Sequence, residues 1–66
     1  MTSQELLNAT LLHFKAVKAR AEVNLDIYLT AVVGVGEHAD IVKEVIELTK
    51  IIVEAEEAIK FLEQKL

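Results

Sequence analysis

The sequence predicts an all-α protein, an antiparallel two-helix hairpin that forms an oligomeric helical bundle. Apolar residues recur every three or four positions on both sides of one central break, which is the period of an amphipathic helix. The only two glycines, Gly34 and Gly36, stand in that break, and the chain has no proline. A chain of 66 residues makes one small domain.

The start and the end of the first helix carry recognisable signals. Thr2 and Glu5, three residues apart, fit a capping box, in which each side chain bonds the backbone N–H of the other. Gly34 is suited to the left-handed position that ends a helix, and Gly36 follows it in the turn. The predicted elements are a helix over about 3–33, a turn over about 34–37 and a helix over about 38–65.

The segment 27–33 is rich in β-branched and aromatic residues, and taken alone it could form a strand. The rest of the chain offers no second strand pattern to pair with it, and an isolated strand is not stable. We therefore expect this segment to continue the first helix.

One apolar stripe on each helix predicts the hairpin core. Its positions step by three and four, as in coiled-coil packing, and Lys18 interrupts it with an aliphatic stem that can lie along the seam. The predicted core consists of Leu7, Leu11, Phe14, Ala21, Leu25, Tyr28, Val32, Ile41, Val45, Leu48, Ile52, Ala55, Ile59 and Leu62.

A second apolar stripe on each helix predicts contacts between copies of the chain. Two helices touch along one line, so they cannot bury four stripes, and a chain of this size without disulfides needs further burial. The predicted oligomer interface consists of Leu12, Ala16, Ala19, Val23, Ile27, Val42, Ile46, Thr49 and Val53. Either both stripes close one oligomer, or they form two distinct interfaces that build a larger assembly.

Composition argues against several classes of protein. The chain has no cysteine, and its net charge of −4 is unfavourable for nucleic-acid binding. Its longest uncharged run, 27–36, is too short to span a bilayer, and Glu5 stands where a secretion signal would be basic. We expect a cytoplasmic protein that is not secreted, with no nucleic-acid or membrane partner.

The sequence offers no catalytic, cofactor or metal site that outweighs a structural explanation. Glu37, His38 and Asp40 cluster near the turn, but acidic groups at a helix N-terminus are common for capping reasons. Glu54, Glu56 and Glu57 also cluster in sequence, but a thin hairpin offers no pocket for an acid–base site, so a solvated helix face is the better interpretation. We therefore predict no catalytic residues, no cofactor and no bound metal.

The region around the turn resembles a family of small uncharacterised proteins of tailed bacteriophages, including viruses of marine cyanobacteria. The resemblance is carried by Leu25-Asp26-Ile27-Tyr28-Leu29, by Val33-Gly34-Val35-Gly36-Glu37-His38 and by Asp40-Ile41-Val42. Family members usually have a proline just before the turn, where this chain has Ala31-Val32-Val33. That departure, with the Ala- and Val-rich second stripe, fits a natural hairpin whose surface has been rebuilt.

These observations predict a non-catalytic structural protein that assembles with itself through two apolar interfaces, as a component of a designed assembly or cage. A second assembly component is a further possible partner. The alternative is a phage accessory protein that binds a host partner through one apolar helical face. The first reading predicts a defined homo-oligomer, and the alternative predicts a small species that binds another protein.

Overall fold

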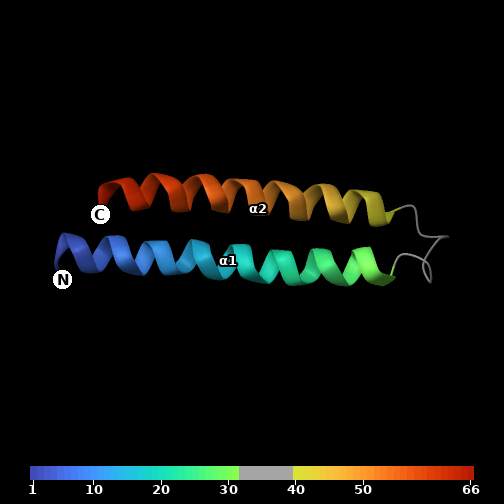
Figure 1. The fold of residues 1–66 in the computed structure, drawn as a ribbon, viewed down its shortest axis with the longest axis horizontal. Coiled ribbons are helices and arrows are strands. Elements are labelled where there is room, and N and C mark those ends of the chain that lie inside the picture. Colours follow the sequence, from blue (N-terminus) through green and yellow to red (C-terminus); the bar gives the residue numbers. More distant parts are fainter. Residues whose placement is uncertain (32–39) are drawn as a thin grey trace.

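The computed structural model describes residues 1–31 and 40–66, and over this part of the chain it contains two helices and no strand. Helix α1 spans Ser3–Ala31 and helix α2 spans Asp40–Lys65. They lie side by side and antiparallel, with both termini at the same end (Figure 1). The predicted all-α hairpin is therefore confirmed.

The described residues include only part of the predicted helix boundaries near the turn. Helix α1 continues to Ala31, so the strand alternative is wrong for positions 27–31. The expected last residues of the first helix, the turn with Gly34 and Gly36, and the first two residues expected in the second helix lie outside the described residues.

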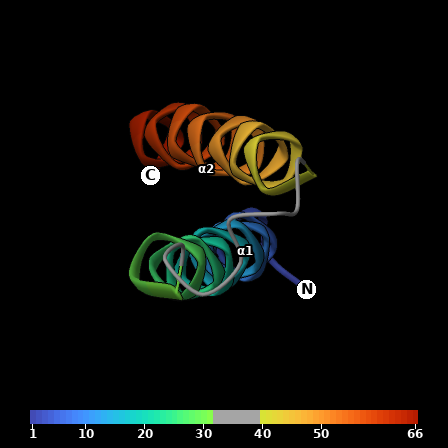
Figure 2. The same ribbon diagram turned by 90° about the vertical axis from the view of Figure 1, so that its right-hand side faces the viewer.

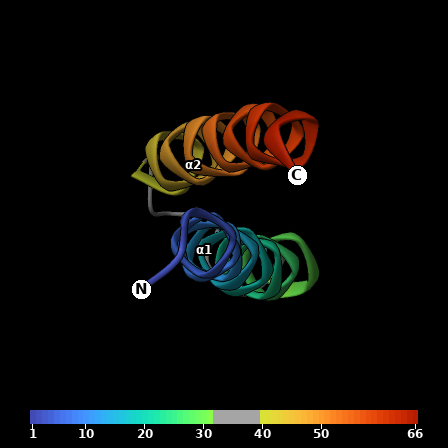
Figure 3. The same ribbon diagram turned by 90° about the vertical axis from the view of Figure 1, so that its left-hand side faces the viewer.

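The molecule is a rod two helices thick. Its Cα trace extends 51 × 14 × 14 Å along the principal axes. The end-on views show α1 and α2 as two separate layers whose axes are slightly inclined to each other (Figures 2 and 3). Among the described residues each helix therefore packs against one other helix, and most of its circumference faces away from that neighbour.

The capping box at the start of α1 is confirmed. The backbone N–H of Thr2 donates to Glu5 Oε1 at 3.0 Å, and the backbone N–H of Glu5 donates to Thr2 Oγ1 at 3.1 Å. The Thr2 backbone N–H, and after it the Thr2 hydroxyl, lowers the pKa of the Glu5 carboxyl group. Two backbone donors of the first turn are thus satisfied while Glu5 is ionised.

We expect the first turn of α1 to loosen in acid. Because the pKa of Glu5 is lower in the folded chain, its stabilising contribution is complete above the unfolded pKa and is lost as the pH falls through the folded pKa. An NMR titration should show the Thr2 amide shifting together with the Glu5 carboxyl carbon, below the ordinary glutamate range. Glu5→Gln should keep the cap and abolish this dependence, and an ordinary pKa for Glu5 would contradict the prediction.

The seam between the helices is where side chains are buried. Among the described residues, five apolar side chains are buried, namely Leu11, Ala21, Leu48, Ala55 and Leu62. The predicted core residues Leu7, Phe14, Leu25, Tyr28, Ile41, Val45, Ile52 and Ile59 are half-buried, and Val32 lies outside the described residues. The two least exposed residues are alanines, Ala55 at 1% and Ala21 at 4%, so small side chains occupy the best-covered positions of the seam.

One charged side chain crosses the seam. Lys18 occupies a core position of α1, and its Nζ lies 3.3 Å from Oε2 of Glu56 on α2. The side chain of Lys18 retains 32% of its exposure, so its stem lies along the seam while the ammonium group stays at the edge. Glu56 also has Lys60 four residues away on its own helix, which is a favourable local spacing for an ion pair. The ion pair that the structure records for Glu56 joins the two helices instead.

Candidate interaction surface

The described part of the chain exposes many large apolar side chains. Met1 and eleven others keep at least 41% of their exposure, whereas the best-covered leucine, Leu11, keeps 7%. The other eleven are Leu6, Leu12, Val23, Ile27, Leu29, Val42, Ile46, Ile51, Val53, Phe61 and Leu66. Single exposed apolar residues are ordinary, so what matters is how these residues are grouped on the two helices.

All nine residues of the predicted oligomer interface are exposed within the single chain: Leu12, Ala16, Ala19, Val23, Ile27, Val42, Ile46, Thr49 and Val53. At 100° per residue they form two separate surfaces. The five on α1 lie on the side away from the seam and are called here the outer face of α1; Ile27 lies at its edge, where it also lines a hollow beside the seam. The four on α2 lie about a quarter turn from the seam and are called here the flank of α2.

The outer face of α1 is strongly exposed at its large residues. Leu12 keeps 66% of its exposure, Val23 59% and Ile27 57%. Ala16 and Ala19 lie between them and are also exposed. No residue of this face carries a formal charge. Helix α1 thus has apolar residues on both its inner and its outer side, with charged residues such as Lys15, Arg20 and Glu22 between them.

The flank of α2 lies near the turn. Val42, Ile46 and Val53 keep 67%, 48% and 46% of their exposure. Thr49 lies among them, and its hydroxyl donates to the Val45 carbonyl oxygen at 2.7 Å. The Thr49 hydroxyl is thus satisfied by its own helix, which leaves the flank without an unpaired hydroxyl donor.

Several exposed apolar residues lie outside the predicted oligomer interface. Leu6, Leu29, Ile51 and Phe61 keep between 41% and 57% of their exposure and belong to neither predicted surface. Lys65 Nζ lies 5.4 Å from the centre of the Phe61 ring, which is within cation–π distance. Helical periodicity places Leu29 and Ile51 beside the core stripes, at the edges of the seam.

Ile51 also lines an open depression between the two helices, on the side of the seam that lies away from the flank of α2. Its walls are formed by Val17, Arg20, Ala21 and Asn24 of α1 with Leu48 and Ile51 of α2. A neighbouring hollow toward the turn adds Ile27, Tyr28 and Glu44. Both are shallow and open, and they mix apolar with polar side chains, unlike the enclosed, mostly apolar sites that hold small molecules.

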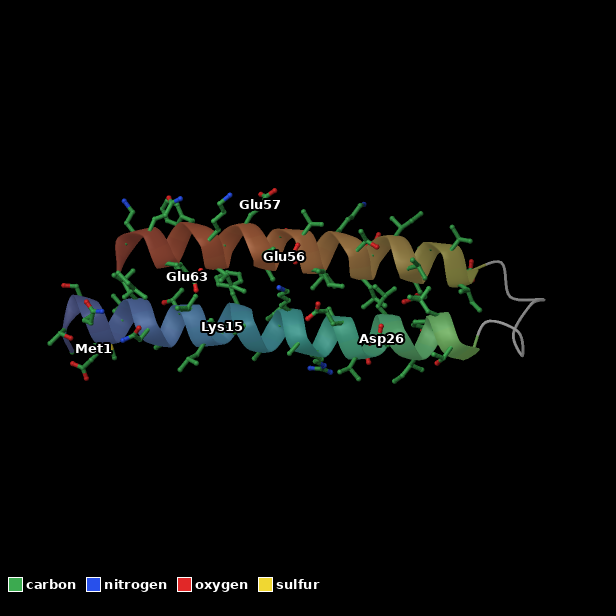
Figure 4. The ribbon with its side chains drawn as sticks, in the orientation of Figure 1. Met1, Lys15, Asp26, Glu56, Glu57 and Glu63 are labelled. Carbon is green, nitrogen blue, oxygen red and sulfur yellow. The ribbon has the colours of Figure 1, made fainter. Side chains whose placement is uncertain are left out.

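Charge is distributed unequally between the two helices. Helix α1 carries three basic and three acidic residues, whereas α2 carries four basic and seven acidic ones. The side of α2 that faces away from α1 is charged, and Glu57 projects from it (Figure 4). Lys50 Nζ lies 3.8 Å from Oε1 of Glu47, three residues earlier on the same helix. The outward side of α2 is therefore more highly charged than the outer face of α1, and its Lys50 and Glu57 share a shallow hollow with Val53 of the flank.

The described residues do not bring metal ligands together. Within residues 1–31 and 40–66, no group of three His, Cys, Asp or Glu side chains is placed to hold a metal ion. Asp40 is described, but Glu37 and His38, the other members of the weak candidate cluster, lie outside the described residues. Neither described helix combines the length and the apolar content required to cross a membrane.

The surface area of the chain is large for its mass. Folded monomers of 7.3 kDa expose about 4,200 Å². This chain exposes 5141 Å², roughly 900 Å² more. A stable protein–protein interface buries about 800 Å² on each partner. The excess area is thus of the size that association would cover.

The fold and this surface define a helical hairpin with unpartnered apolar faces. Comparison with known proteins adds no relative: no family model matches the chain, and no curated protein or solved structure is significantly similar to it. The resemblance of the turn region to small phage proteins stays a prediction.

Proposed function

We propose that this protein is a non-catalytic structural component that assembles with itself through its exposed apolar faces. The single observation that carries the proposal is the contrast between the seam and the outside. Five apolar side chains are buried among the described residues, whereas twelve large apolar ones remain at least 41% exposed. Covering them with a second copy would remove apolar surface from water at about 25 cal/mol for each Å².

The size of the chain supports the same proposal. A hairpin of two helices gives every side chain at most one neighbouring helix, and no large side chain of the described residues falls below 2% exposure. Domains below about 70 residues rarely gain more than 3–5 kcal/mol from their own core. The chain has no cysteine to add a disulfide. Association therefore supplies the burial that the single hairpin lacks.

Two separate apolar surfaces favour more than one kind of contact. The outer face of α1 and the flank of α2 point in different directions, so one flat partner surface cannot cover both. Two distinct interfaces allow dihedral oligomers or closed cages, in which one contact forms a small unit and the other joins the units. On this proposal the chain is an assembly component, natural or designed.

Native mass spectrometry of the purified chain across a series of micromolar concentrations tests the proposal. A closed species of defined copy number, or a ladder of multiples of a smaller unit, is the expected result. A ladder would indicate two separate interfaces. A monomer that persists at every concentration would overturn the proposal and favour the alternative of a protein that binds another partner.

A further inference from the structure

The outer face of α1 lies on a helix with no net charge, whereas the flank of α2 lies on an acidic helix. This difference indicates which molecule covers the outer face of α1. We propose that a second copy of this chain covers it, with the two α1 helices antiparallel about a two-fold axis near Ala19. This inference rests on the proposed self-assembly and specifies one of its interfaces. Three features of the described residues support it, namely net charge, the order of residue sizes, and the charges along one edge.

Net charge favours contact through α1. Helix α1 has equal numbers of basic and acidic residues, whereas α2 has three more acidic than basic ones. If α1 meets α1, the two acidic helices lie on the outside with two helices between them. Helices pack 8–10 Å apart, so the acidic helices are then separated by more than the Debye length of about 8 Å at physiological salt. Contact through two α2 helices would instead bring like charges together.

The order of residue sizes suits an antiparallel arrangement. Along the outer face of α1 large residues lie toward both ends, Leu12 at one end and Val23 with Ile27 at the other. A two-fold axis near Ala19 puts Leu12 within about 1.5 Å, along the helix, of the level of the partner's Ile27. It places the exposed Ala16 and Ala19 at the centre, where small side chains let two backbones approach closely.

Two of the three charges along one edge of this face are complementary under the same axis, and the third, Asp26, lies level with the partner's Leu12. Lys15 and Glu22 lie seven residues apart, on the same side of α1 and on opposite sides of Ala19. An antiparallel pair brings each Lys15 beside the partner's Glu22, within about 1.5 Å of the same level, and the pairing occurs twice. On the opposite edge the exposed Arg20 side chains lie near the axis, where water and salt screen them.

Cysteine cross-linking tests the arrangement directly, because the chain has no cysteine of its own. A disulfide requires Cα atoms within about 7 Å. Ala19→Cys lies at the axis and should form a cross-linked dimer under mild oxidation. Leu12→Cys should not cross-link to itself, since the two copies of position 12 lie about 20 Å apart along the helix. A mixture of the Leu12→Cys and Ile27→Cys variants should cross-link.

The matched control is Glu47→Cys, a single cysteine at an exposed position of α2 that belongs to neither predicted surface. It reports collisions in solution and should give little dimer. Equal cross-linking of the Leu12 and Ala19 variants would indicate parallel helices and overturn the inference. If native mass spectrometry shows an oligomer but Ala19→Cys cross-links no more than the control, the inference fails while the proposed self-assembly stands. A monomer in that measurement overturns both.

Discussion

Val23→Glu is expected to reduce the assembly to smaller species while the hairpin stays folded. Val23 is 59% exposed and lies in the outer face of α1, so glutamate there meets water in the single chain. At a contact between copies the same carboxylate would be buried without a partner, at a cost of about 3 kcal/mol or more. That corresponds to a dissociation constant raised at least about a hundredfold.

The measurement for this variant is native mass spectrometry beside far-ultraviolet circular dichroism at the same concentration. Gln64→Glu is the matched control, because it adds one negative charge at an exposed position of α2 outside both predicted surfaces. It should leave the assembly unchanged. An unaltered size distribution for Val23→Glu would show that the outer face of α1 is not an interface. The equivalent change Ile46→Glu examines the flank of α2 in the same way.

Leu48→Ala should produce the largest loss of stability of any single truncation that we consider. Leu48 is one of the three buried leucines of the described seam, at 9% exposure, and it faces α1 in the half of the hairpin nearest the turn. Leucine-to-alanine changes in a packed core cost about 2–5 kcal/mol. A small domain has little more than this in total, so the variant should be partly unfolded at room temperature.

Thermal unfolding followed by circular dichroism measures this loss, at one fixed protein concentration because association also stabilises the folded chain. Leu6→Ala makes the same chemical change at a residue with 57% exposure and should cost far less. If the two variants melt together, the seam around Leu48 does not carry the stability of the hairpin.

The core was predictable because the period of a helix fixes which residues share a face. The alternation of three and four residues from Leu11 to Tyr28 and from Ile41 to Leu62 selects side chains that the structure buries or half-buries. The edges of the seam follow the same geometry, which places Val17 beside the core stripe of α1. Val17 and Ala58, adjacent in sequence to the core positions 18 and 59, are half-buried as well.

The pairing of charged side chains was not predictable in the same way. Glu56 has Lys60 four residues away on its own helix, which is a favourable local arrangement. The structure pairs it with Lys18, thirty-eight positions earlier in the chain, because the antiparallel register brings the two to one level. The spacing of residues within one helix does not show which residues of the other helix lie at the same level. The hydrophobic pattern of one chain likewise cannot identify the molecule that covers the outer face of α1. No part of the described chain packs against that face.

The position of the two termini has a consequence for anything joined to the chain. Met1 and Leu66 lie at the same end of the rod and are both exposed. Fluorescent proteins or antigens fused to either terminus would therefore leave from one pole of each hairpin, away from the turn. In a pair built by antiparallel α1 helices, the two fusions would leave from opposite poles. Energy transfer between donor and acceptor labels at the termini would be weak in such a pair and strong in a parallel one.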